Sequence, residues 1–463
     1  MTISKIKPQK NLPLPPNPKN SRCLFLYYQL LIYSIYSGLL VLRGSVLLWL
    51  KLHLDFVAVT LSVLVQVPLA IFLGHYFDQT AFMDTGYLVS AGINPYQPHI
   101  ITIFSPRFMA VDPIIGDPPL WPLLLGAIYR LSYNIIPNIF LYNFAIKVPV
   151  IASNIGLAYI SKKILKQQGA SDKKIQFVWL FLLFNPFLLL TTTAWGQFET
   201  LISLLCVTSL YLLSKGMTKK SAILLSLSAV LKPISLPLLG LPLLSSPRNN
   251  WAKMLQYILI SASIIMTLWI LPFYLFGWTP PSSNNQVTSY FTRAGGMTPF
   301  TLVELFQNTI TLPTNLAFLG YIWIPALLIG YYLVYRNPPK SFDELTQKAI
   351  GIMLIFFLTY SWLSEPYVNV AIALALLALP FAKMDFPNFH FLWIVPLIFM
   401  VVNTNFAQLF YFVSPSIIPT LALFDQQIRI WRLIAMFIVA IIWQIFAWRL
   451  VVKLFSTKIK SES

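Results

Sequence analysis

Residues 180–190 read LFLLFNPFLLL, a run in which apolar and polar residues do not alternate. Apolar runs near twenty residues long recur on both sides of it, and an α-helix needs such a run to cross a hydrocarbon core of about 30 Å. A membrane β-barrel would instead show short segments that alternate between apolar and polar residues. The sequence therefore predicts an all-α fold, that of a polytopic helical membrane protein.

The composition excludes a soluble class. Hydrophobic residues make up 57% of the 463 residues and charged residues 10%, with a mean hydropathy of +0.72, whereas soluble proteins carry about 25% charged residues. The net charge is +18, but the basic residues are scattered through short loops and not clustered on one face as in a nucleic-acid binder. We expect membrane lipids and no nucleic acid as partners. Cys23 and Cys206 have neither a disulfide pattern nor a metal-ligand spacing.

The apolar runs predict about 10–13 membrane helices, with boundaries uncertain by several residues. They lie near residues 53–74, 139–160, 175–193, 199–214, 221–244, 254–276, 314–334, 349–363, 369–382, 389–411 and 430–452. Three prolines interrupt 221–244, which predicts short, bent half-helices there. Two loops, 75–138 and 277–313, are longer than the roughly 12–15 residues above which loops are usually functional or disordered. Their aromatic and proline content favours ordered, functional loops.

Basic and acidic residues are sorted to opposite sides of the predicted membrane. The positive-inside rule places the lysine-bearing loops and both termini in the cytosol. The remaining loops, which carry most of the acids, then face outward. Those outer acids are Asp78, Asp84, Asp112, Asp117, Glu199, Glu304, Glu365 and Asp425.

Four segments follow from this orientation. We expect residues 1–23 to be a disordered basic cytosolic tail and residues 453–463 to be a second cytosolic tail. Residues 24–52 are an interfacial or re-entrant segment, because 24–74 is too long for one crossing and too short for three. Residues 53–452 form a single transmembrane domain.

The first long loop opens with His75-Tyr76-Phe77-Asp78 and continues to Asp84. A carboxylate at the membrane boundary lies beside both a lipid-embedded and an aqueous substrate, and it can accept a proton from an attacking hydroxyl. Two other interpretations remain open. Asp78 can instead cap the first interfacial helix, and Asp84 can lie on the solvated face of that helix.

The order and spacing of the residues around Asp78 resemble those of a known protein family. Asp78, Phe82, Asp84, Gly92 and Pro95-Tyr96, followed by Pro118-Pro119-Leu120, resemble the first outer loop of the GT-C superfamily glycosyltransferases. The similarity is greatest to the catalytic subunit of GPI mannosyltransferase and its prokaryotic polyprenol-dependent relatives, and it covers roughly residues 53–380. Further matching segments are Asn185-Pro186, 195–199, Lys232-Pro233, 289–293, 298–300 and 364–367.

The resemblance implies an inverting glycosyltransferase on the non-cytosolic face of a cell membrane or endoplasmic reticulum. It would move a hexose, commonly mannose, from a polyprenyl- or dolichyl-phosphate donor to a glycan or glycolipid acceptor. Relatives carry an Asp-x-Asp pair where this sequence has Tyr76 and Asp78. The first carboxylate is therefore missing, which makes a divalent cation doubtful and predicts no metal site or other cofactor. Asp78 becomes the first candidate for the catalytic base and Asp84 the second.

The remaining candidates follow from the needs of a phosphate-linked sugar donor. Lys232 lies within a span, where an ionisable group is functional by default; it can bind the phosphate or pair with Glu199. Arg293 suits phosphate oxygens or a lipid headgroup. Glu199 can equally be a helix N-terminal charge, and Glu365 can contact sugar hydroxyls or serve a turn. The predicted substrate-binding residues are His75, Tyr76, Gln197, Glu199, Lys232, Arg293 and Glu365.

Two other functions remain open. One is a non-catalytic subunit of a glycolipid-processing complex; the retained Asp78 and Asp84 argue against it, and the missing first carboxylate argues for it. The other is a lipid or solute transporter. Transporters commonly show inverted repeats and midplane ionisable residues, but the halves of this sequence show no clear repeat and most acids lie at the outer boundary.

Overall fold

The computed structural model describes residues 53–99, 101, 103–104, 115–245, 251–279, 295–301, 321–381 and 386–456. The predicted tail 1–23, the whole 24–52 segment, residues 457–463 of the second predicted tail and the candidate Arg293 lie outside the described residues. The chain divides into two compact units, residues 1–61 and residues 62–463. Of the first unit only residues 53–61 are described, and every site residue discussed below belongs to the second unit.

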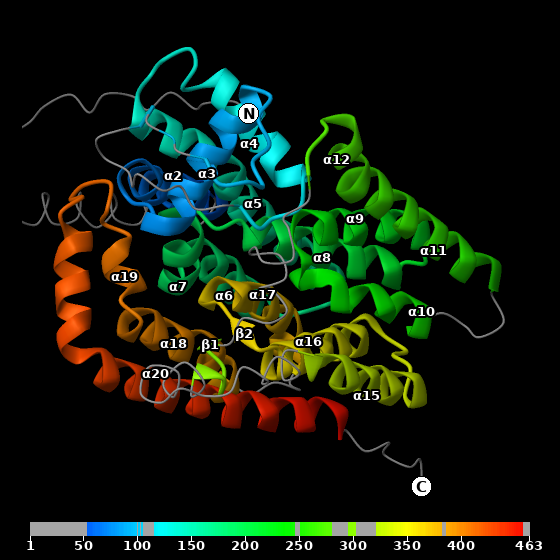
Figure 1. Cartoon of the computed structure of the whole chain (residues 1–463). Helices are drawn as coiled ribbons and strands as arrows, with labels where there is room; N and C mark the ends of the chain where they lie inside the picture. Colours follow the sequence, from blue (N-terminus) through cyan, green and yellow to red (C-terminus); the bar gives the residue numbers. More distant parts are fainter. Residues whose placement is uncertain are drawn as a thin grey trace, which may run out of the picture. The chain divides into compact units, whose positions relative to one another are not determined.

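The described chain is helical apart from two short strands (Figure 1). The strands, β1 (Gly295–Gly296) and β2 (Trp362–Leu363), pair in parallel. The helices are α2 (Leu54–Phe72), α3 (Tyr76–Ser90), α4 (Leu120–Leu131), α5 (Ile139–Gln167), α6 (Asp172–Phe184), α7 (Pro186–Leu189), η1 (Leu190–Ala194), α8 (Glu199–Ser214), α9 (Thr218–Leu231), η2 (Pro233–Gly240), α10 (Leu241–Ser245), α11 (Trp251–Ile265), η3 (Met266–Ile270), α12 (Leu271–Leu275), α15 (Trp323–Arg336), α16 (Phe342–Thr359), η5 (Glu365–Tyr367), α17 (Val368–Ala378), η6 (Leu379–Phe381), α18 (Phe386–Val402), α19 (Asn405–Gln408) and α20 (Ile417–Phe455).

The predicted class, a helical membrane protein, is confirmed. Five helical segments of the described chain are long and apolar enough to cross a membrane, and shorter apolar helices lie between them. The five are 54–72, 139–167, 172–194, 251–275 and 417–455. The total of 10–13 crossings stays a prediction, because the shorter helices fall below the length that a spanning helix requires on its own.

The expected interruption of the 221–244 segment lies at Lys232. Helix α9 ends at Leu231, and Lys232 is extended, with φ −152° and ψ 126°. Pro233 explains the break, because a proline disfavours the helical conformation of the residue before it and has no N–H to donate. A short 3₁₀ helix and α10 complete the segment. The break leaves a lysine at a helix end inside the bundle.

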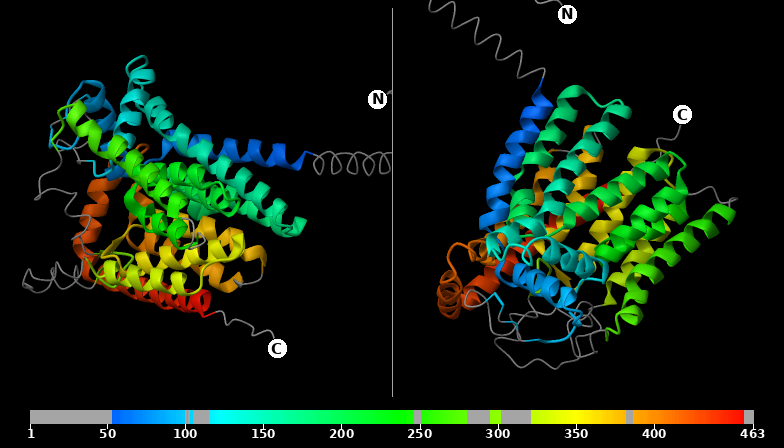
Figure 2. Two further views of the ribbon diagram at one scale, coloured as in Figure 1. Left: turned by 90° about the vertical axis from the view of Figure 1, so that its right-hand side faces the viewer. Right: turned by 90° about the horizontal axis from the view of Figure 1, so that it is seen from above.

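The described lysine-bearing loops, which follow α5, α8 and α15, gather at one end of the bundle (Figure 2). At that end, Tyr211 in the last turn of α8 donates a hydrogen bond through its hydroxyl to the side chain of Gln167, the last residue of α5. Its ring also contacts Phe342 at the start of α16, with centroids 5.8 Å apart. Lys174 Nζ donates to the Pro380 carbonyl at 2.6 Å. Sequence-distant basic loops therefore share one end, while its assignment to the cytosol stays a prediction.

The first predicted outer loop contains two helices that pack together, α3 and α4. Gly86 makes the close approach possible, because a Cβ at this position would lie 2.9 Å from the Leu125 carbonyl oxygen. Helix α5 then starts at the Asn138 cap, whose side chain accepts from the Phe140 and Leu141 amides. The packed helices hold the start of α3 near the end of the bundle opposite the lysine-bearing loops.

Candidate active site

Asp78 lies in the first turn of α3, but it is not the cap of that helix. The cap is His75, whose Nδ1 accepts from the Asp78 amide at 3.4 Å. The capping interpretation of Asp78 is therefore wrong. Its carboxylate oxygen Oδ2 instead accepts hydrogen bonds from Trp195 Nε1 at 2.6 Å and Gln197 Nε2 at 2.8 Å. Within the described residues, the other carboxylate oxygen, Oδ1, has no hydrogen-bond donor.

The turn that carries Trp195 and Gln197 depends on glycine. The π-helix η1 ends at Ala194, and Gly196 follows with φ +100°, a conformation that favours glycine. A Cβ at residue 196 would also collide with the buried side chain of Gln79. The reversal at Gly196 lets the two neighbouring side chains donate to the same carboxylate oxygen.

Gln197 connects Asp78 to a buried ion pair. While its Nε2 donates to Asp78, its Oε1 accepts from Lys232 Nζ at 2.8 Å. The Lys232 ammonium also donates to Glu199 Oε1 at 2.5 Å, and both charged residues are buried. Of the two interpretations of Lys232, its pairing with Glu199 is confirmed, and its binding of a phosphate stays a prediction. Glu199 is also the first residue of α8. One amide side chain thus separates Asp78 from the lysine.

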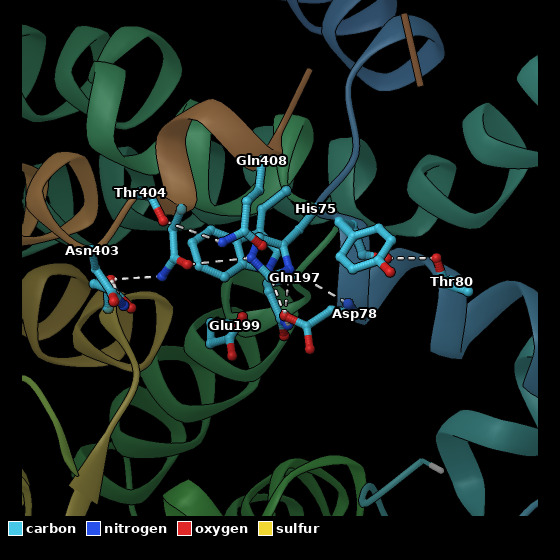
Figure 3. A network of polar contacts seen from close by, with 12 residues as sticks. His75, Asp78, Thr80, Gln197, Glu199, Asn403, Thr404 and Gln408 are labelled. Atoms are coloured by element: carbon cyan, nitrogen blue, oxygen red, sulfur yellow. Dashed lines mark hydrogen bonds and ion pairs between the residues drawn. The ribbon is translucent and has the colours of Figure 1, made fainter. Parts of the chain in front are cut away.

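His75 lies on the other side of Asp78 and at the centre of a longer network (Figure 3). Its ring stacks on Trp195, with centroids 4.1 Å apart. Asn405 donates through Nδ2 to Glu365 Oε1 at 2.9 Å, so its oxygen faces His75 Nε2 at 3.4 Å. Because the Asn405 oxygen only accepts, Nε2 carries the hydrogen and Nδ1 accepts from the Asp78 amide.

The environment of His75 favours its neutral form. Burial lowers the pKa of His75 below its usual range, although the Asp78 carboxylate, with Oδ2 3.5 Å from Nδ1, opposes this shift. A neutral ring in a fixed tautomer is suited to holding the start of α3. His75 therefore orients Asp78 through the hydrogen bond that its Nδ1 accepts from the Asp78 amide.

Two other predicted substrate-binding residues are engaged by the protein. Glu365 is buried, and its Oε1 accepts from Asn403 at 3.4 Å as well as from Asn405. The half-buried Tyr76 packs edge-on against Tyr411, with centroids 4.8 Å apart. Burial raises the pKa of the Tyr76 hydroxyl. These contacts connect the start of α3 and the turn before α17 to the segment around α19.

Asp84 lies farther along α3 than Asp78. Asp84 is six positions after Asp78, which is about 9 Å along a helix axis. Its side chain is buried, with 2% of the residue exposed, so the solvated-face interpretation of Asp84 is wrong. The structure brings Asp78, His75, Gln197, Glu199, Lys232 and Glu365 into one connected network.

An apolar cavity of about 290 Å³ adjoins this network. Lys232 and Tyr367 line it, and the Lys232 ammonium lies 5.0 Å from the centre of the Tyr367 ring. Much of the rest of the wall comes from hydrophobic and aromatic side chains, among them Ile234, Leu236, Trp269, Trp323, Leu327, Leu328 and Phe356. A hydrophobic cavity with a cation at its wall suits an amphiphile that carries a negative charge.

The comparison with known families decides the class of the protein. Residues 135–387, more than half of the chain, match the model of glycosyltransferase family 87. The chain belongs to this family. No curated protein matches it.

As a member of glycosyltransferase family 87, the protein is a membrane glycosyltransferase that uses a sugar donor and an acceptor. The match includes Gln197, Glu199, Lys232 and Glu365, whereas the loop that carries Asp78 precedes it. The likeness to GPI mannosyltransferase stays a prediction. In the described part of this glycosyltransferase, no group of three or more His, Cys, Asp or Glu residues is placed to hold a metal ion.

Sequence reasoning missed Lys147, a fully buried lysine on α5 of this glycosyltransferase. Its Nζ donates to the carbonyl oxygens of Leu73 at 2.5 Å and Ala194 at 3.0 Å. Leu73 lies two residues before His75, and Ala194 directly precedes Trp195. The lysine therefore ties together the two segments that meet at Asp78. The sequence feature that could have indicated Lys147 is its position within the apolar run 139–160, where a lysine is unusual.

Asp117 was noted in the sequence only as one of the outer acids. It is buried, and within the described residues its side chain has no hydrogen-bond donor. Burial raises the pKa of Asp117 to about 7, and the positive charge of Lys232 partly opposes this shift. The neighbouring Gly116 lines the apolar cavity. A carboxyl that titrates near neutral pH therefore lies close to the candidate site.

Proposed function

We propose that this family 87 enzyme transfers a hexose from a polyprenyl- or dolichyl-phosphate donor to a hydroxyl of a glycan or glycolipid. Mannose is the first candidate sugar, and the non-cytosolic face is the expected side. One observation carries the proposal: the Gln197 amide bonds to both Asp78 and Lys232. A base and a cation suited to a phosphate therefore lie on two sides of one residue.

In the proposed reaction, Asp78 acts as the general base. The acceptor hydroxyl gives its proton to Oδ1 of Asp78 as its oxygen forms a bond to the anomeric carbon of the donor. The bond between that carbon and the phosphate oxygen breaks on the opposite side, so the configuration inverts. Trp195 and Gln197 support this role because their hydrogen bonds to Oδ2 orient the carboxylate.

The donor lipid would place its phosphate near Lys232 and its first isoprene units in the apolar cavity. Negative charge develops on the leaving phosphate, and a fixed cation is most effective where such charge develops. The mostly hydrophobic lining suits the isoprenoid. Arg293, which lies outside the described residues, is proposed as a second phosphate ligand. In this proposal the Lys232 ammonium, which Glu199 and Gln197 hold in place, contacts the phosphate directly.

Transfer by the purified protein alone is the test of this function. Reconstituted in liposomes with a polyprenyl-phosphoryl-mannose and glycan acceptors, it should release polyprenyl phosphate and form a product of inverted anomeric configuration. Mass spectrometry of glycans and glycolipids from cells with and without the gene would identify the acceptor and the sugar. Transfer only with a second subunit would favour the non-catalytic alternative. Counterflow uptake without transfer would favour a transporter.

Filling the cavity from its lipid-facing side should weaken donor use. Leu328 lines the cavity and is 63% exposed, so Leu328→Trp should narrow the cavity with little effect on the core. We expect the KM for the donor to rise about tenfold with little change in kcat, as when binding is lost equally in the ground and transition states. The measurement is steady-state kinetics at varied donor concentration.

Leu423→Trp is the matched control, because Leu423 on α20 is exposed to nearly the same extent, 62%, and does not line the cavity. It should leave the donor KM unchanged. Equal kinetic effects of the two substitutions would contradict the placement of the lipid.

A further inference from the structure

Asp117 has a hydrogen bond to its backbone, whereas its side-chain carboxyl has no hydrogen-bond donor among the described residues. The Tyr96 hydroxyl donates to the Asp117 carbonyl oxygen at 3.0 Å, and only 5% of the residue is exposed. Within the described residues no group donates to its side chain, and Oδ1 is fully enclosed. Burying a carboxylate without a hydrogen-bond donor is costly. A group of this kind calls for an explanation in a native protein.

The charges that face Asp117 come from several elements. Its interaction with Lys232, at the break between α9 and η2, is attractive. Its interactions with Glu199 on α8 and Asp78 on α3 are repulsive. The negative charge of Asp117 also contributes to raising the pKa of two phenols, Tyr96 and Tyr367. Lys232 is the attractive partner, but Glu199 already neutralises it at 2.5 Å.

A donor phosphate would add another negative charge to this site. A phosphodiester carries one negative charge, and the pair of Lys232 and Glu199 has none in sum. Ionised Asp117 and Asp78 would then both repel the phosphate. A nearby negative charge favours the neutral form of a carboxyl group. Asp117 is the carboxyl that can take up a proton most easily, because its side chain has no hydrogen bond to lose among the described residues.

We propose that Asp117 takes up one proton from solvent when the donor phosphate binds beside Lys232, and that its carboxyl then donates a hydrogen bond to a phosphate oxygen. This inference rests on the lipid-phosphate donor of the proposed function. The buffered solvent supplies the proton, the buffer acid becomes its conjugate base, and an O–H bond forms on the carboxylate; no bond to carbon is made or broken. Donor binding and proton uptake are thereby linked at this one side chain.

The sign of the pH dependence follows. The pKa of Asp117 is raised to about 7 by burial, so below that pH the carboxyl is mostly neutral and the site can receive the phosphate. Above it, the carboxylate must be protonated before the donor binds. With uptake of one proton, we expect the dissociation constant to rise about tenfold between roughly pH 6 and pH 8.

Isothermal titration calorimetry of the full-length protein in nanodiscs measures this linkage directly. The probe is farnesyl-phosphoryl-mannose, whose phosphodiester keeps one charge throughout this pH range. Titration in two buffers of different ionisation enthalpy gives the number of protons taken up. We expect close to one proton per donor at about pH 8 and close to none at about pH 6.

Asp117→Asn replaces the carboxyl with a neutral group of similar shape that can still donate. It should bind the probe with the same affinity at both pH values and take up no proton. Asp172→Asn on α6, at the lysine-bearing end of the bundle, is the matched control and should keep the wild-type pH dependence.

Three results would overturn the inference. The first is donor binding by the wild-type protein without proton uptake at about pH 8. This measurement needs only the wild-type protein, so it tests the inference even if the Asp117 variant does not fold. The second is undiminished uptake in a folded Asp117→Asn protein. In both cases the proposed function stands. The third is absence of probe binding at every pH, which would reject the lipid-phosphate donor as well.

Discussion

Asp78→Asn is expected to reduce sugar transfer by about 10²–10⁴-fold, the usual contribution of a general base. The amide keeps an oxygen that can accept from Trp195 and Gln197, so the local structure should persist. It cannot remove a proton from the acceptor hydroxyl. The measurement is kcat of the purified variant, together with its amount in the membrane, which should match that of the wild-type protein.

Asp84→Asn is the matched comparison, because Asp84 lies on the same helix and was the second candidate for the base. We expect it to retain transfer within about tenfold of wild type, below the range typical of a lost base. If Asp84→Asn is inactive and Asp78→Asn transfers sugar at the wild-type rate, the assignment of the base is wrong.

Lys232→Met should both destabilise the protein and impair the reaction. It leaves Glu199 buried without its cation, and removing one partner of a buried ion pair costs about 3–5 kcal/mol. It also removes the charge proposed to stabilise the leaving phosphate. Hydrogen bonds to charged groups contribute about 1.5–3 kcal/mol, so we expect kcat/KM to fall by about 10- to 100-fold in the protein that remains folded.

A second substitution separates these two effects. Lys232→Met combined with Glu199→Gln leaves no unpaired buried charge at this pair, so Tm should recover most of the loss. Transfer should remain as low as in the single variant, because the phosphate still lacks its cation. Wild-type activity of the double variant would show instead that Lys232 serves only to neutralise Glu199.

Structural features that depend only on residues close together in the sequence could be predicted from it. The helical membrane class follows from apolar runs, because a spanning helix satisfies its backbone hydrogen bonds within itself. The break at Lys232 follows from Pro233, which acts on its immediate neighbour. The sequence also paired Lys232 with Glu199 as one of two alternatives, since a buried charge requires a partner.

Contacts between distant segments were not predictable. The sequence could not assign the cap of α3 to His75, because aspartate is a preferred capping residue by type and histidine is not. The donors to Asp78, Trp195 and Gln197, lie 117 and 119 residues away in the chain. The Asn405 contact that orients His75 spans 330 residues. The burial of Asp117 likewise depends on packing that its neighbours in the sequence do not reveal.

The sequence by itself determined a helical membrane protein with sorted charges and a lysine at a helix break, because hydropathy, loop charge and proline act locally. It also singled out the loop that begins at His75 as the place to look for a base. Only the tertiary structure decided that Asp78 is oriented by the Trp195–Gln197 turn and connected through one amide to Lys232. That connection requires α3, the turn before α8 and the end of α9 to pack together, and such packing depends on the whole bundle.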